Sequence, residues 1–199
     1  MEQKIQRGGV PSQGLAYRVN KDGVTCAVTG QGTCKDLDIV IPEEIDGYRV
    51  TAIFCPNFAW GFSKRITSVI VADSVTEISR NAFAYRPKLA RVVLPRFLTS
   101  IEESTFAECV SLTQITVPEA VTAIGKQAFV GCANLTQVTL PKSLSCIDDC
   151  AFAFCGKLER IHYEGTKQKW KSVTLHENWR FASSLLAIRC TKTGDTVRL

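Results

Sequence analysis

The sequence predicts a single solenoid domain, mostly β, in which coils of 23 residues stack on one another and a β-hairpin caps each end. Four consecutive segments align without gaps at this period: 66–88, 89–111, 112–134 and 135–157. The same positions are apolar in all four, and in the last three a proline occupies position seven. Because one coil cannot bury its own apolar edge, a repeat of this length indicates coils that bury one another.

The composition is that of a soluble globular domain. The 199 residues can bury one core, and 45% of them are hydrophobic and 22% charged. The apolar runs are too short to cross a bilayer, so no membrane insertion is expected. The first nine residues lack the apolar stretch of a signal peptide, which favours the cytoplasm. An extracellular or cell-surface location would require that an export signal has been removed.

The charge pattern does not indicate a nucleic-acid-binding protein. The net charge of +5 is mild, and the basic residues are scattered. The tightest basic group is Lys167, Lys169 and Lys171, and aromatic residues are not interleaved with it as a stacking platform would require. Nucleic acid is therefore not an expected partner.

The N-terminal residues 1–35 are expected to form a tail and a β-hairpin that caps the first coil. Alternating apolar residues at 15–19 and 24–28 flank a turn sequence, Asn-Lys-Asp-Gly, at 20–23.

The leucine-rich part of the chain is expected to span residues 36–164. A stretched first copy occupies 36–65, with Ile39 and Ile41 in the strand positions and Phe58 at position eighteen. The four regular coils follow, and a partial copy ends the region at 158–164.

Each coil is expected to contain a strand, a second short extended piece and a turn. Apolar positions four and six alternate with polar positions three and five, which is the period-two pattern of a strand with one buried face. The proline at position seven has no N–H group and ends strand pairing. A short helical or 3₁₀ turn then leads to a phenylalanine at position eighteen that fills the interior. These phenylalanines are Phe83, Phe106, Phe129 and Phe152.

Residues 165–199 are expected to cap the other end of the stack. Thr166 is in position to N-cap a short helix that runs through Trp170. A strand at 185–190 and a turn at 193–195 then lead into a final strand. We expect Trp170 and Trp179 to cover the last coil; the alternative is an exposed stacking platform for a sugar.

The nine cysteines do not indicate a disulfide framework or a metal site. Three of them share position twenty-one and should stack as an inward ladder of reduced thiols, which suits the cytosol. These three are Cys109, Cys132 and Cys155. Cys26 and Cys34 form the one pair worth testing for a bridge. A zinc site built from Cys146, Cys150, Cys155 and His162 is not expected, because the spacing lacks a CxxC pair and these positions face different sides of a coil.

No catalytic constellation stands out, so neither enzymatic activity nor a cofactor is expected. The chain has only two histidines, His162 and His176. The adjacent carboxylates at 102–103 and 148–149 fall at solvent-facing positions, and no glycine-rich phosphate loop follows a strand.

The segment LTQITVPEAVTAIGKQAFVGCAN, residues 112–134, resembles the repeat of the bacterial BspA-like leucine-rich-repeat family, LTSVTIPxSVTxIGxxAFxGCxx. The resemblance extends over residues 15–190, with departures at Ala72, Arg86 and Thr105. It implies a leucine-rich-repeat solenoid of the α/β horseshoe class and a role in surface adhesion and protein–protein contact. The family has no catalytic residues to carry over.

The solvent face of the main sheet is the predicted binding surface. Side chains at positions three and five point away from the core, and arginines and exposed aliphatic residues are plausible contact residues. The predicted contact residues are Arg91, Val93, Gln114, Thr116, Gln137, Thr139, Arg160 and His162.

These observations support the hypothesis of a non-catalytic, monomeric module that binds a protein partner of unknown identity through the concave sheet face. Two alternatives stay open: a structural spacer or surface-display scaffold without a specific site, and a carbohydrate-adhesion module. The carbohydrate-adhesion module needs an exposed aromatic platform, for which Trp60 is the best candidate.

Overall fold

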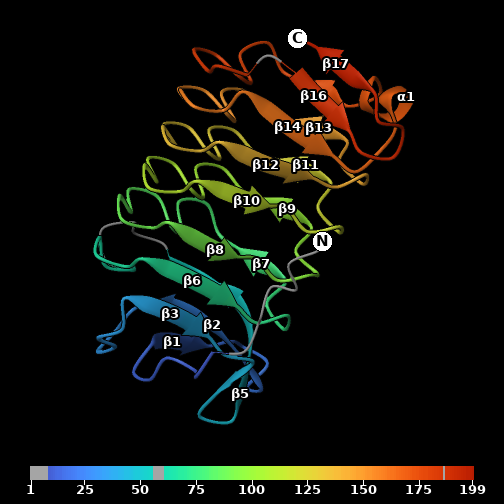
Figure 1. The fold of residues 1–199 in the computed structure, drawn as a ribbon. Coiled ribbons are helices and arrows are strands. Elements are labelled where there is room, and N and C mark those ends of the chain that lie inside the picture. The colour runs from blue at the N-terminus through green and yellow to red at the C-terminus, as the bar shows by residue number, and fades with distance from the viewer. Residues whose placement is uncertain (1–8, 56–60, 186) are drawn as a thin grey trace.

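A computed structural model describes residues 9–55, 61–185 and 187–199 of the chain. The chain winds into a stack of coils that runs from the N-terminal to the C-terminal end, with parallel strands lying side by side along the stack (Figure 1). The mostly-β solenoid predicted from the repeat is confirmed. Within the described residues, no helix has the length and hydrophobicity needed to span a membrane.

The main sheet contains the strand at positions three to six of each coil. It comprises β3 (Asp38–Ile41), β6 (Ser68–Val71), β8 (Arg91–Val93), β10 (Gln114–Thr116), β12 (Gln137–Leu140), β14 (Arg160–Tyr163), β16 (Ala187–Cys190) and β17 (Thr196–Arg198). Its hydrogen bonds divide it into two parts, β3-β6-β8 and β10-β12-β14-β16-β17. Equivalent residues are paired: Gln114 lies beside Gln137, and Gln137 beside Arg160. The columns of the sequence repeat are therefore rows of neighbouring side chains.

A second row of short strands covers the other side of the core. Its members are β5 (Tyr48–Ile53), β7 (Glu77–Ile78), β9 (Ser100–Ile101), β11 (Ala123–Ile124), β13 (Cys146–Ile147) and β15 (Thr174–Leu175). β4 (Glu44–Ile45) forms a tight hairpin with β5 inside the stretched copy. The isoleucine at position thirteen of each coil points inward, and Ile101, Ile124 and Ile147 are all buried. Both strand rows thus enclose one hydrophobic column.

The position-eighteen phenylalanines stack along one interior axis, as predicted. Ring centroids are 5.7 Å apart for Phe83 and Phe106, 5.4 Å for Phe106 and Phe129, and 5.2 Å for Phe129 and Phe152. The stretched copy contributes Phe62, whose ring lies 5.1 Å from that of Phe83. The sequence assigned this place to Phe58, which lies outside the described residues. Among the described residues of this copy, Phe62 is the ring that stacks on Phe83.

The segment before each phenylalanine forms consecutive β-turns instead of the expected helical or 3₁₀ turn. In the coil 66–88, Asn81 and Tyr85 adopt positive φ angles of 60° and 58°, which interrupt helical geometry. The N–H of Phe83 donates to the carbonyl of Thr105 in the next coil at 3.0 Å. The same bond, one coil later, joins Phe106 to Ala128 at 2.9 Å. The turns thus hydrogen-bond from coil to coil, as the strands do.

A hairpin lies at each end of the stack, as predicted. β1 (Ala16–Val19) pairs antiparallel with β2 (Thr25–Gly30), and β2 pairs in parallel with β5. At the other end, β16 pairs with β14 and then antiparallel with β17. The N-terminal hairpin therefore extends the second row of strands, whereas the C-terminal hairpin extends the main sheet.

The C-terminal end is sealed by aromatic packing. Thr166 N-caps helix α1 (Lys167–Trp170) and its hydroxyl accepts a hydrogen bond from the backbone N–H of Lys169, as predicted. The ring of Trp179 lies edge-on to Phe152 with centroids 6.2 Å apart, and Trp170 packs against Trp179 at 6.5 Å. Both tryptophans are buried, so they cover the last coil and do not form an exposed sugar platform.

Candidate functional site

The outward side chains at positions three and five of the main sheet form a regular surface, which we call the sheet face. Its members are Ser68, Ile70, Arg91, Val93, Gln114, Thr116, Gln137, Thr139, Arg160 and His162, continued by Ala187, Arg189, Thr196 and Arg198. The strands point these residues outward because the alternating residues, such as Ile115, Val138 and Ile161, are buried in the core. The structure therefore brings all eight predicted contact residues onto the sheet face, with Arg91 and Val93 in the part β3-β6-β8 and the other six in the part β10-β12-β14-β16-β17.

The polar residues at the centre of the face are accessible. Arg91, Gln114, Thr116, Gln137 and Arg160 are exposed, while Thr139 and His162 are half-buried. Within the described residues, the amides of Gln114 and Gln137 form no side-chain hydrogen bond. Their donors and acceptors are thus available to another molecule.

Val93 does not have the exposure that the alternating pattern predicted. Its side chain is only 4% exposed. β8 lies inside the sheet, paired with β6 and next to β10, and the short branched valine projects less far than a neighbouring arginine or glutamine. Val93 therefore lies beneath the neighbouring side chains of the sheet face. A partner could contact Val93 only if those side chains moved.

The face has an acidic position near its N-terminal end. The carboxylate of Asp38 accepts hydrogen bonds from the hydroxyls of Thr67 at 2.6 Å and Ser68 at 2.7 Å. These two bonds, with a smaller contribution from the positive charge of Arg91, lower the pKa of Asp38 below its usual value. Asp38 is thus a negative charge on β3, separated from Arg91 on β8 by Ser68 on β6.

Two arginines at the C-terminal end of the face were missed by the repeat analysis. Arg189 lies beside His162, and Arg198 lies beside Ala187, which is itself the neighbour of Arg160. Both arginines follow the last recognisable 23-residue row, so no column contained them. The signal available in the sequence was the alternation Ile188, Arg189, Cys190, which is typical of a strand with one buried face and points Arg189 outward.

The cysteines on the inner side are structural. The thiols of Cys109, Cys132 and Cys155 each donate to a backbone carbonyl in the preceding coil, at 3.1 to 3.2 Å. Burial raises the pKa of Cys109 and Cys155 to about 12, and that of Cys132 well above its usual value. These thiols form the predicted stacked ladder and stay protonated at neutral pH.

All nine cysteines are free, so Cys26 and Cys34 are not bridged. In the parts of the chain that the structure describes, no three His, Cys, Asp or Glu side chains gather closely enough to hold a metal ion. His162 lies in the main sheet, whereas Cys146 lies in the second row of strands. A histidine–carboxylate contact joins His176 Nδ1 to Asp148 Oδ1 at 3.4 Å on the surface.

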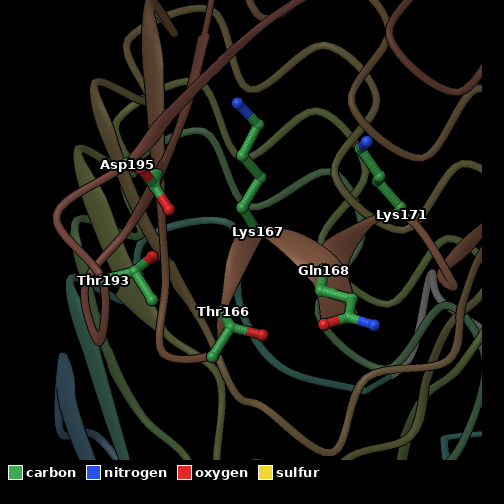
Figure 2. Close-up of a pocket in the computed structure, with 6 residues that line it drawn as sticks. All are labelled: Thr166, Lys167, Gln168, Lys171, Thr193 and Asp195. Atoms are coloured by element: carbon green, nitrogen blue, oxygen red, sulfur yellow. The ribbon is translucent and has the colours of Figure 1, made fainter.

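A shallow hollow of about 420 Å³ lies between α1 and the turn that precedes β17. Figure 2 shows Lys167 and Lys171 extending from α1, with Thr193 and Asp195 on the neighbouring turn. The six residues that line it are polar, and none of them is buried. It offers no fixed recognition geometry of the kind that the sheet provides.

Trp60, the predicted candidate for a carbohydrate platform, lies outside the described residues. The described aromatic residues with substantial exposure are Phe54, Tyr85, Phe97, Phe154 and Phe181. Phe154 and Phe181 contact each other edge-to-face at 5.6 Å, which does not provide the flat pair of rings on which a sugar stacks.

Comparison with known proteins gives one family and several solved structures. Residues 55–179 match the model of the BspA type leucine rich repeat region in six copies. A leucine rich cell surface protein of Faecalibacterium prausnitzii A2-165 is 29% identical with a TM-score of 0.72, over 83% of this chain and 42% of that one. A leucine rich repeat protein of T. pallidum is 30% identical with a TM-score of 0.69, over 78% of this chain and 71% of that one.

The pneumococcal vaccine antigen PcpA is 22% identical with a TM-score of 0.68, over 91% of this chain and 49% of that one, and shares the fold. This chain therefore spans less than half the length of the F. prausnitzii and pneumococcal structures. A comparison with curated proteins gives no significant match.

Proposed function

Because this chain belongs to the BspA-type leucine-rich-repeat family, we propose that it is a non-catalytic module that binds a protein partner through the sheet face. The observation that carries this proposal is the row of exposed polar side chains at the centre of the face, held in register by parallel strands. A rigid sheet presents these groups without the entropic cost of ordering a loop, which favours binding. Arg91 and Arg160 add a residue type that is common in protein interfaces.

As part of the same proposal, we infer that this chain is located at the cell surface, as the related protein of F. prausnitzii is. The sequence favoured the cytoplasm because the first nine residues lack the apolar stretch of a signal peptide and the cysteines were expected to be reduced. However, seven of the nine are buried, and Cys109 and Cys155 have raised pKa values. Buried protonated thiols react slowly, so they are compatible with an oxidising exterior. Labelling of intact host cells with a membrane-impermeant reagent tests this location, and labelling only after lysis would contradict it.

Site-directed photo-crosslinking tests the binding face. A photoreactive benzoylphenylalanine replaces Gln114 or Gln137 in separate variants, and a matched control carries it at exposed Lys126, outside the sheet face. In extract of the native host, the two sheet variants are expected to crosslink the same protein, and the control is not. The quadruple variant R91A/Q114A/Q137A/R160A is then expected to lose affinity for that protein, because interface contacts concentrate in few residues. Equal crosslinking from Lys126, or unchanged affinity of the quadruple variant, would contradict the proposal.

A further inference from the structure

The C-terminal part of the sheet face carries a cluster of three arginines: Arg160 on β14, Arg189 on β16 and Arg198 on β17. In β16 the side chains of Ile188 and Cys190 are buried, so Arg189 points outward. In β17 the partly buried Val197 packs against the core, which places Arg198 on the outer face as well. We call these three residues the arginine cluster.

The strand register places the members of the cluster close together. Arg160 is paired with Ala187, and Ala187 with Arg198, so two strand spacings of about 4.8 Å separate the two arginines at the backbone. Arg189 lies two residues along β16 from Ala187, at about 6.6 Å. His162 is the direct neighbour of Arg189. The three guanidinium groups therefore rise from an area about 10 Å across.

No described residue forms an ion pair with this cluster. Arg160, Arg189 and Arg198 are exposed and form no ion pair or side-chain hydrogen bond with a described residue. In contrast, Arg96 is paired with Asp73 at 2.7 Å. The strands β10, β12, β14, β16 and β17 contain no aspartate, glutamate or lysine.

The charge on the sheet face is therefore uneven. Near the N-terminal end the negative charge of Asp38 is balanced by Arg91, whereas the arginine cluster at the other end carries positive charge with no acidic residue on its strands. The centre, formed by glutamines and threonines, is neutral. A partner that spans this face would need acidic groups at the C-terminal end.

We propose that the arginine cluster binds an acidic segment of a partner protein, with aspartate or glutamate at alternating positions of an extended peptide. This inference rests on the proposed function and specifies its partner. Alternate side chains of an extended peptide lie on one side of its backbone about 6.6 Å apart, so such a peptide can present several carboxylates to an area about 10 Å across. The planar guanidinium pairs with a carboxylate through two parallel hydrogen bonds, a geometry that lysine cannot provide.

Peptide binding measured by fluorescence anisotropy tests this proposal on the whole chain. The probe is a labelled twelve-residue peptide of alternating Glu and Thr, and the matched probe has Gln in place of every Glu. The variant is R160Q/R189Q/R198Q, and the control variant is K64Q/R80Q/K88Q, which removes the same charge from exposed sites outside the sheet face. R160K/R189K/R198K keeps the charge and removes the guanidinium fork. Circular dichroism establishes that each variant is folded.

We expect the acidic peptide to bind the wild type at least about ten-fold more tightly than the glutamine peptide, with an affinity that falls as salt rises. The cluster variant should lose about ten-fold and the control variant less than about two-fold, because only neighbouring charges act strongly at physiological ionic strength. The lysine variant should lose about three-fold, because charge persists without bidentate pairing.

Three outcomes would overturn the inference. One is equal loss in the cluster and control variants, which would assign binding to net charge. Another is absence of any binding by the acidic peptide. The third is tighter, cluster-dependent binding of heparin or single-stranded DNA, which would assign the cluster to a different polyanion. Crosslinking from Gln114 and Gln137 does not depend on these arginines, so the proposed function can hold when this inference fails.

Discussion

Substitution of Phe129 by alanine tests whether the interior stack holds the coils together. Phe129 has no exposed surface, and its ring lies between those of Phe106 at 5.4 Å and Phe152 at 5.2 Å. The substitution leaves a ring-sized void with neighbours fixed by hydrogen bonds on both sides. A buried phenylalanine replaced by alanine costs about 3–5 kcal/mol, and the upper half of that range is expected here because both ring contacts are lost.

The loss is large compared with the usual stability of a domain, about 5–15 kcal/mol. At roughly 2–4 °C per kcal/mol for a chain of this size, a loss of about 4–5 kcal/mol should lower the Tm by about 8–20 °C. Urea denaturation followed by circular dichroism measures the free energy of unfolding, and an unchanged m-value shows that the native fold is retained.

A matched control separates packing from a general effect of losing an aromatic ring. Phe97 is 62% exposed, and F97A should change the free energy of unfolding by less than about 0.5 kcal/mol. F129L, which fills part of the void, should fall between the two variants. A loss below about 1 kcal/mol for F129A, or equal losses for F129A and F97A, would refute the account of the stack as the main source of cohesion between coils.

Three further predictions concern the inner column and its end. W179A removes the ring that closes the stack on Phe152, and it should lower the free energy of unfolding by about 3–5 kcal/mol and promote association. Urea denaturation measures the first effect and light scattering the second. A stable, monomeric W179A variant would contradict the capping role of Trp179. In R86A, the carbonyl of Ala84 loses a hydrogen-bond donor that lies 2.6 Å away, and a buried side chain is deleted. The free energy of unfolding, measured by urea denaturation, should therefore fall by about 2–4 kcal/mol. An unchanged value would show that Arg86 does not stabilise this coil. The thiols of Cys109 and Cys155 keep their protons up to a pKa of about 12, whereas the unfolded thiol ionises near 9, so the unfolded state binds fewer protons and stability should fall as pH rises from 9 towards 12. C109A/C155A should show a weaker fall than the wild type over that range, and identical slopes would contradict the raised pKa values.

The regular part of the candidate site could be predicted from the sequence because it is periodic. Gln114, Gln137 and Arg160 share a column, and the observed register pairs them directly. The accessibility of Val93 could not be predicted in the same way. Alternation gives the direction in which a side chain points, but exposure depends on how far neighbouring side chains project. The contribution of Arg198 was also hidden, because it depends on a hairpin outside the repeat.

The sequence by itself determined the coil. A period of 23 residues with the same apolar positions in every row leaves one register in which all of them are buried together, so strand order, the phenylalanine stack and the thiol ladder follow from it. The tertiary structure alone decided the features without a period. These are the identity of Phe62 as the ring stacked on Phe83, the docking of each hairpin on a different row of strands, and the approach of Arg189 and Arg198 to Arg160. The physical reason is that insertions and terminal hairpins have no equivalent in the other coils, so their positions depend on packing between segments distant in sequence.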